Sequence, residues 1–184
     1  MDPVLLPAGY LALYGTANLV ALGLVALAAR RPDLARWFFV TLFLSASVLN
    51  GILMRLDPQL YVDGYGSLAL LAPYRRFIVG FFARHTVPIV LGIALGQLAV
   101  GLLLTRRGRW LLLGGLGGSV FLLAIAPLGA AAAFPAPLAL LVALLLTVLR
   151  MEWQPTAAPR VPGTAAERQT HLASGRTVRG SGVR

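Results

Sequence analysis

The chain alternates between long apolar stretches without charge and short segments that contain arginine. A helix needs roughly 20 apolar residues to cross a bilayer, and five stretches meet or approach this length: 11–29, 37–54, 86–105, 110–132 and 136–149. The last two belong to one uncharged run, and its prolines predict a turn near residues 134–137. The pattern therefore predicts an all-α fold, a polytopic bundle of membrane-spanning helices in residues 1–153.

Composition favours a membrane protein over a water-soluble one. Hydrophobic residues make up 58% of the 184 residues and charged residues only 12%. Soluble domains of this size usually contain about 25% charged residues. The composition therefore excludes an ordinary soluble fold.

All sixteen basic residues are arginines, and their distribution predicts how the chain is oriented. Twelve lie in the loops after the first and third stretches or from Arg150 onward, whereas four lie on the opposite side: Arg55, Arg75, Arg76 and Arg84. Cytoplasmic loops of membrane proteins are enriched in arginine and lysine. We therefore expect the N-terminus outside and the C-terminus in the cytoplasm.

Residues 154–184 differ in composition from the rest of the chain. They are rich in proline, glycine, serine and threonine with scattered arginines, which predicts a disordered basic cytoplasmic tail. Its arginines are suited to anionic lipid. Because no aromatic residues are interleaved with the arginines, we expect the lipid bilayer as partner and no specific nucleic acid.

The longest predicted loop, residues 56–85, lies on the outer side. Turn signals occur at residues 57–58 and 63–66, and the apolar residues of 74–84 follow helical spacing beside arginines. This pattern predicts an interfacial amphipathic helix. The helix serves either as an anchoring connector or as a lid over a site that opens to the outside, in which case the lid residues are Tyr74, Arg75, Arg76, Phe77, Phe81 and Arg84.

The predicted spans contain polar residues but no ionisable residue near mid-membrane. Proton relays and many ion-coupled transporters need a buried Asp, Glu or His. Asn50, Arg55 and Gln97 are the residues we expect to line a ligand site. Gln97 stands out because it lies near the centre of its span, where an unpaired amide is costly. Hydrogen bonding between helices is the alternative role.

Other chemistry has no support in the sequence. The chain contains no cysteine, and its two histidines are far apart, so we expect no metal ligands. No catalytic motif and no cofactor motif is evident, and we predict no catalytic residue.

Two pairs of glycines match the spacing that allows helices to pack closely in membranes. They are Gly92 with Gly96 and Gly114 with Gly118. Each pair predicts a helix contact.

Three segments share a pattern of glycines, apolar residues and single polar residues: GILMRLDP at 51–58, GQLAVGLLL at 96–104 and FLLAIAPLG at 121–129. In these segments the chain resembles the DoxX-like family of small four-helix membrane proteins, whose relatives include quinol-oxidase accessory subunits. The resemblance extends from Arg36 to about Leu149. Many relatives have an acid in place of Gln97 and a lysine in place of Arg55.

The resemblance implies a four-helix DoxX-like core with one extra N-terminal transmembrane helix, located in a bacterial or archaeal cytoplasmic (inner) membrane. It also implies a non-catalytic accessory subunit of a quinone-linked or respiratory membrane assembly, with other membrane subunits as partners and a quinone as ligand. A second hypothesis is a small transporter or lipid-handling protein that binds a hydrophobic ligand in the bundle beneath the lid. This hypothesis requires an internal cavity open to one side. A structural membrane scaffold is the third hypothesis.

Overall fold

The computed structural model describes residues 8–66 and 68–153, and every regular element in this part of the chain is a helix. Five elements are long and apolar enough to cross a membrane: α1 (Ala8–Arg30), α2 (Pro32–Leu56), α5 (Thr86–Leu104), α6 (Arg109–Ile125) with its 3-10 continuation η2 (Ala126–Ala132), and α7 (Ala136–Trp153). The predicted all-α polytopic bundle is confirmed. The tail predicted at 154–184 lies outside the described residues.

Local sequence explains where these helices begin and end. Pro32 occupies the first turn of α2, where its missing N–H is not needed. Gly108, with φ of 62°, separates α5 from α6. The turn predicted at 134–137 is present: Ala133 has φ of 53°, and a cis peptide bond precedes Pro135. After this turn α7 extends to Trp153, beyond the predicted end at residue 149.

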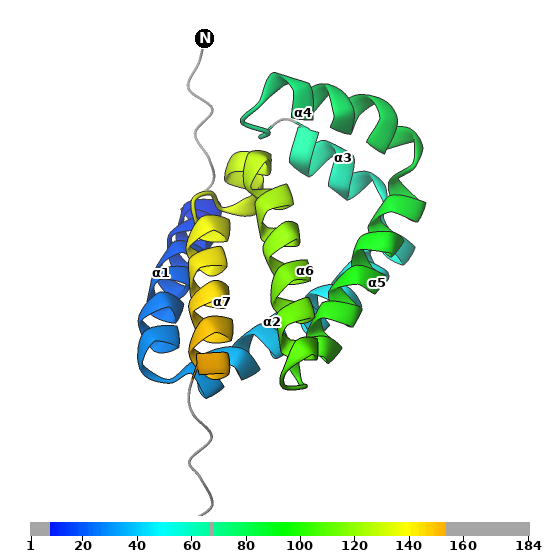
Figure 1. The fold of residues 1–184 in the computed structure, drawn as a ribbon. Coiled ribbons are helices and arrows are strands. Elements are labelled where there is room, and N and C mark those ends of the chain that lie inside the picture. The colour runs from blue at the N-terminus through cyan, green and yellow to red at the C-terminus, as the bar shows by residue number, and fades with distance from the viewer. Residues whose placement is uncertain (1–7, 67, 154–184) are drawn as a thin grey trace, which may run out of the picture. The chain divides into compact units, whose positions relative to one another are not determined.

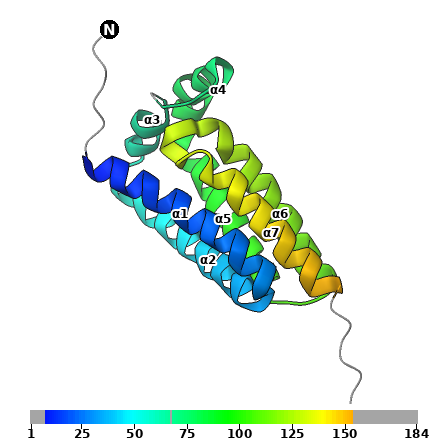
Figure 2. The same ribbon diagram turned by 90° about the vertical axis from the view of Figure 1, so that its left-hand side faces the viewer.

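Four of the spanning helices form a closed ring, and the fifth lies outside it. Contacts run from α2 to α5, from α5 to α6, from α6 to α7 and from α7 back to α2. Helix α1 packs along α7 and α2 (Figures 1 and 2). The arrangement of four helices plus one N-terminal helix agrees with the predicted fold class.

Helix α1 is fixed to the turn that precedes α7. The hydroxyl of Tyr14 donates a hydrogen bond to the carbonyl oxygen of Phe134. Asn18 Nδ2 donates to the carbonyl oxygen of Ala133 at 3.1 Å. Two polar side chains of a lipid-exposed helix thus satisfy carbonyl groups of an irregular turn, which lacks a regular hydrogen-bond pattern of its own.

One of the two glycine pairs packs closely. A Cβ atom added to Gly118 would lie 2.7 Å from Leu144 Cδ2, and one added to Gly114 would also be crowded. By contrast, a Cβ atom on Gly92 or Gly96 would meet nothing within 4 Å. The helix contact predicted at Gly92 and Gly96 is therefore wrong within this chain, because that face of α5 is exposed.

The segment between α2 and α5 contains two short helices at one end of the bundle (Figure 1). They are α3 (Gln59–Gly66) and α4 (Ala72–Phe77), and α4 continues as a π-helical turn, η1 (Ile78–Phe82). The helix predicted at 74–84 is thus present. The turn predicted at 63–66 is wrong, because α3 runs through it. The carboxylate of Asp57 accepts a 3.0 Å hydrogen bond from the backbone N–H of Gln59 and so supports the start of α3.

This segment is docked onto the end of α6. The backbone N–H of Leu70 donates to the carbonyl oxygen of Pro127 at 3.0 Å. Gly129 adopts φ of 68°, and a Cβ atom there would lie 2.5 Å from the carbonyl oxygen of Leu68. Only glycine accommodates both this backbone conformation and this close approach.

Candidate functional site

A cavity of about 430 Å³ lies within the ring beneath α3, α4 and η1. Its wall is formed by side chains from all of α2, α3, α4, η1, α5, α6, η2 and α7, and most of them are aliphatic or aromatic. The cavity is partly open to the surroundings. Its volume and lining are typical of sites that bind a small organic molecule.

A chain of hydrogen bonds between three side chains lies in the cavity wall. Tyr61 of α3 donates from its hydroxyl to Asn50 Oδ1 at 2.5 Å. Asn50 of α2 in turn donates from Nδ2 to Gln97 Oε1 of α5 at 2.7 Å. Gln97 is only 4% exposed, so the amide is compensated by this partner rather than by water. The chain links two spanning helices to the short outer helix.

The hydrogen-bond chain ends in an unused donor. Among the described residues Gln97 Nε2 has no hydrogen-bond partner, although an amide nitrogen carries two donors. Among the described residues, this nitrogen is not one of the side-chain atoms that are both fully enclosed and unpaired. It therefore retains some accessible surface, and Gln97 is one of the residues that line the cavity. Gln97 can thus offer an N–H donor to a molecule in the cavity.

The structure brings together two of the three predicted site residues. Asn50 and Gln97 line the cavity and are bonded to each other. Arg55 is exposed and is not part of the wall. It follows Asn50 by five residues, which places it about 140° away around the helix axis.

Of the predicted lid residues, Tyr74 and Phe77 line the cavity. The hydroxyl of Tyr74 donates to the carbonyl oxygen of Ala124 on α6 and so joins the lid to the ring. The remaining lid residues are exposed and lie outside the wall: Arg75, Arg76, Phe81 and Arg84. The lid therefore turns an aromatic face toward the cavity and keeps its arginines away from it.

Sequence reasoning did not select Tyr61. Residues 59–66 contain Asp63 and two glycines, which are turn signals, and these concealed a helix. The four-residue spacing of Tyr61 and Tyr65 was the available signal, since such residues share a helix face. Their rings lie 5.8 Å apart in the structure, and both line the cavity.

The cavity is electrically neutral at ordinary pH. No charged side chain contributes to the wall formed by the described residues. Burial raises the pKa of Tyr61, Tyr65 and Tyr74 above the usual value of 10.0, and the neighbouring Tyr65 adds a smaller upward effect at Tyr61. The phenols therefore remain protonated, and those of Tyr61 and Tyr74 donate hydrogen bonds. A neutral wall of this kind suits an uncharged ligand.

No family model, curated protein or solved structure matches the chain. The fold and the cavity define its class: a multi-pass helical membrane protein with an internal cavity of ligand size.

Proposed function

We propose that this integral membrane protein binds an uncharged hydrophobic ligand with a polar head group inside the ring of helices. This is the ligand-handling hypothesis among those expected from the sequence. The observation that carries it is the pairing of an apolar cavity of about 430 Å³ with the unused N–H donor of Gln97. A bundle packed solid offers a ligand no such space.

The proposal assigns a different role to each part of the wall. An oxygen of the ligand head group accepts a hydrogen bond from Gln97 Nε2, while Asn50 and Tyr61 hold the amide in place. The apolar tail contacts the aliphatic and aromatic side chains. Tyr74 and Phe77 cover the end of the cavity that faces the short outer helices.

A quinone is one ligand whose chemistry fits these residues. It has carbonyl oxygens that accept hydrogen bonds, a flat ring suited to aromatic neighbours such as Tyr65, and an apolar tail. The resemblance to the DoxX-like family, and with it a role as an accessory subunit of a quinone-linked or respiratory assembly, remains a prediction. So does the orientation with the C-terminus in the cytoplasm of an inner membrane.

Native mass spectrometry of gently solubilised protein tests the proposal. Ala46 lines the cavity, so Ala46→Phe places an aromatic ring in it and reduces its volume, whereas Ala99 is exposed on α5 outside the wall. Wild type and Ala99→Phe should retain a bound hydrophobic molecule, and Ala46→Phe should lose it by about tenfold, equivalent to 1.4 kcal/mol. Equal retention by the two variants, or no bound molecule in wild type, would contradict the proposal.

The same measurement separates the finer hypotheses. The mass of the released molecule distinguishes a quinone from a membrane lipid. Co-purification of oxidoreductase subunits would support the accessory role. A ligand without any partner subunit would favour the transporter or lipid-handling role.

A further inference from the structure

Arg36, on the first turns of α2, carries a buried charge without a carboxylate partner. The side chain is 6% exposed, and no ion pair to Arg36 is found among the described residues. Its Nη1 donates to the carbonyl oxygen of Arg106 at 3.5 Å, the outer limit for a hydrogen bond. Its Nε is fully enclosed and has no partner. A buried guanidinium charge is costly without an anion beside it, and none lies beside this one among the described residues.

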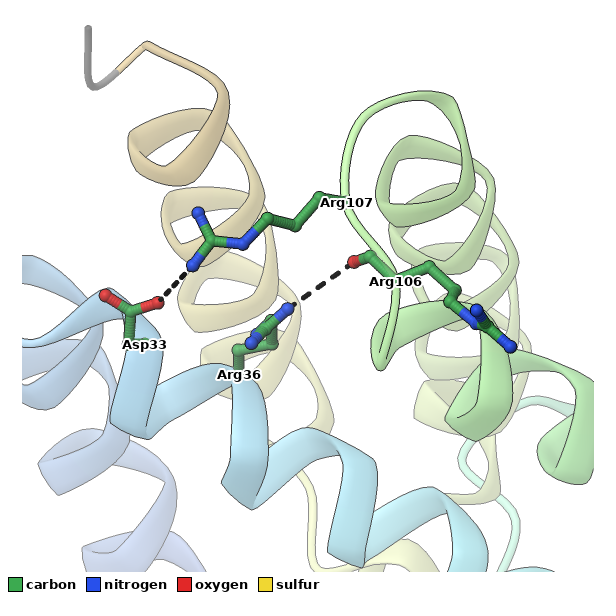
Figure 3. A network of polar contacts seen from close by, with 4 residues as sticks. All are labelled: Asp33, Arg36, Arg106 and Arg107. Carbon is green, nitrogen blue, oxygen red and sulfur yellow. Dashed lines mark hydrogen bonds and ion pairs between the residues drawn. The ribbon is translucent and has the colours of Figure 1, made fainter. Parts of the chain in front are cut away.

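The nearest acidic residue along the chain is already engaged. Asp33 accepts a hydrogen bond from Arg107 Nη2 at 3.5 Å, and both side chains are largely exposed. Figure 3 shows Arg107 reaching from the α5–α6 loop toward Asp33, with Arg36 between Asp33 and the carbonyl group of Arg106. The side chain of Arg106 points away from this place, so two arginine charges, those of Arg36 and Arg107, lie beside a single aspartate and leave an excess of positive charge.

Aromatic residues place this cluster at the level of the lipid head groups. Trp37 and Trp110 follow directly after Arg36 and Arg109, and both tryptophans are about half exposed at the helix ends. Tryptophan is enriched where the membrane meets water. The guanidinium of Arg36 also lies 5.2 Å from the centre of the Trp37 ring and makes a cation–π contact with it. This contact provides no hydrogen-bond acceptor for the N–H groups of Arg36.

We propose that Arg36, Arg107 and the α5–α6 loop form a binding site for an anionic phosphate group. Arg36 supplies the planar fork that matches phosphate oxygens, and Arg107 supplies a second, more exposed cation. The site lies at the opposite end of α2 from Asn50 and is independent of the cavity. An anionic phospholipid at the membrane surface and free inorganic phosphate share this chemistry.

The test uses the full chain in nanodiscs of phosphatidylcholine with or without phosphatidylglycerol. Native mass spectrometry measures retained lipid, and thermal unfolding measures stability. Wild type should retain phosphatidylglycerol over phosphatidylcholine and unfold at a higher temperature when it is present. Arg36→Gln should lower this preference about tenfold and abolish the thermal shift. Arg36→Lys, which keeps the charge but loses the fork, should fall between them.

Arg109→Gln is the matched control. It removes one positive charge from the start of α6, at the same end of the bundle, but Arg109 lies over the Trp110 ring, at 5.1 Å, and not in the cluster. It should retain the wild-type preference within about twofold. If it lost as much preference as Arg36→Gln, general charge would explain the binding and the proposal would be overturned. Equal retention by wild type and both variants would overturn it as well.

Two further arms complete the design. Arg107→Gln should weaken retention less than Arg36→Gln, and it keeps the test decisive if Arg36→Gln does not fold. Titration with inorganic phosphate in phosphatidylcholine nanodiscs identifies the source. If phosphate stabilises wild type more than Arg36→Lys and displaces phosphatidylglycerol, the site accepts free phosphate. If phosphate has no effect while phosphatidylglycerol is retained through Arg36, the site is specific for lipid.

Discussion

The two ends of the helix ring differ in how closely their helices pack. Near the α5–α6 loop the ring is filled by side chains, and Phe39, Leu104 and Leu111 are almost fully buried. Toward α3 and α4, the helices α5 and α6 diverge (Figure 1), and a cavity of about 430 Å³ separates their side chains. We refer to these as the arginine end and the lid end.

Small residues account for the close packing toward the arginine end. Three glycines leave room for a side chain of a neighbouring helix. That side chain lies within 3.1 Å of where a Cβ atom would be at Gly101, Gly114 and Gly115. At the lid end the helices present Ile93, Gln97 and larger aromatic residues instead. Without a hydrophobic driving force between helices in lipid, such close approach determines where the ring closes. The comparison teaches that glycine placement decides which end is packed and which holds the cavity.

The largest expected effect follows from breaking the packed region. Gly118→Leu places atoms where Leu144 Cδ2 already lies, 2.7 Å from the added Cβ. We expect the free energy of unfolding in detergent to fall by about 1–3 kcal/mol, the usual cost of overpacking. Gly96→Leu is the control, because a Cβ atom there meets nothing within 4 Å. Equal stability of the two variants would contradict the role assigned to glycine placement.

The second prediction concerns the polar chain at the lid end. Gln97→Leu removes the donor that faces the cavity, and we expect ligand retention to fall about tenfold. Stability should change by only about 0.6 kcal/mol and by at most about 1.7 kcal/mol, the average and the maximum measured for hydrogen bonds between membrane helices. Native mass spectrometry and unfolding in detergent measure the two quantities.

Ser47→Ala is the control for this variant. Ser47 Oγ donates to the carbonyl oxygen of Ala94 at 2.7 Å, so it also joins α2 to α5, but it does not line the cavity. Its loss should reduce stability slightly and leave ligand retention unchanged. Loss of ligand in both variants would indicate that Gln97 acts only through helix packing.

The sequence predicted the spanning helices well because length and hydropathy are local properties. The prolines near residue 135 also located the final turn. A partner for Gln97 could be expected because an unpaired amide is costly in the membrane, and Asn50 is that partner. The cavity was not predictable in the same way, since its size depends on the divergence of α5 and α6 rather than on any one segment.

Two residues show where sequence reasoning stopped. Tyr61 was hidden in a segment with turn signals that folds as a helix once Asp57 supports its start. Arg36 looked like any other loop arginine, and nothing local indicates that it alone of its group becomes buried beneath the backbone of Arg106. Both depend on contacts between residues distant in the sequence.

A smaller effect is expected from opening the lid. Tyr74→Phe removes the hydrogen bond to the carbonyl oxygen of Ala124 but keeps the ring in the wall. A hydrogen bond of this kind contributes about 1 kcal/mol. We therefore expect ligand dissociation to be about fivefold faster, measured by exchange with labelled ligand. Tyr14→Phe breaks a similar bond to Phe134 away from the cavity and should leave the rate unchanged.

The smallest expected effect is that of pH at the lid end. Burial raises the pKa of Tyr61 and Tyr74 above 10.0, so the protonated phenol is favoured in the folded state. The stability that this preference contributes is fully present below the pKa of a free phenol and is lost as pH rises through the higher folded value. Ligand retention should therefore be constant between about pH 6 and 9 and decline only above about pH 10. A transition near neutral pH at the lid end would therefore require an ionisable group that the cavity wall of the described residues does not contain, and it would contradict the neutral site proposed.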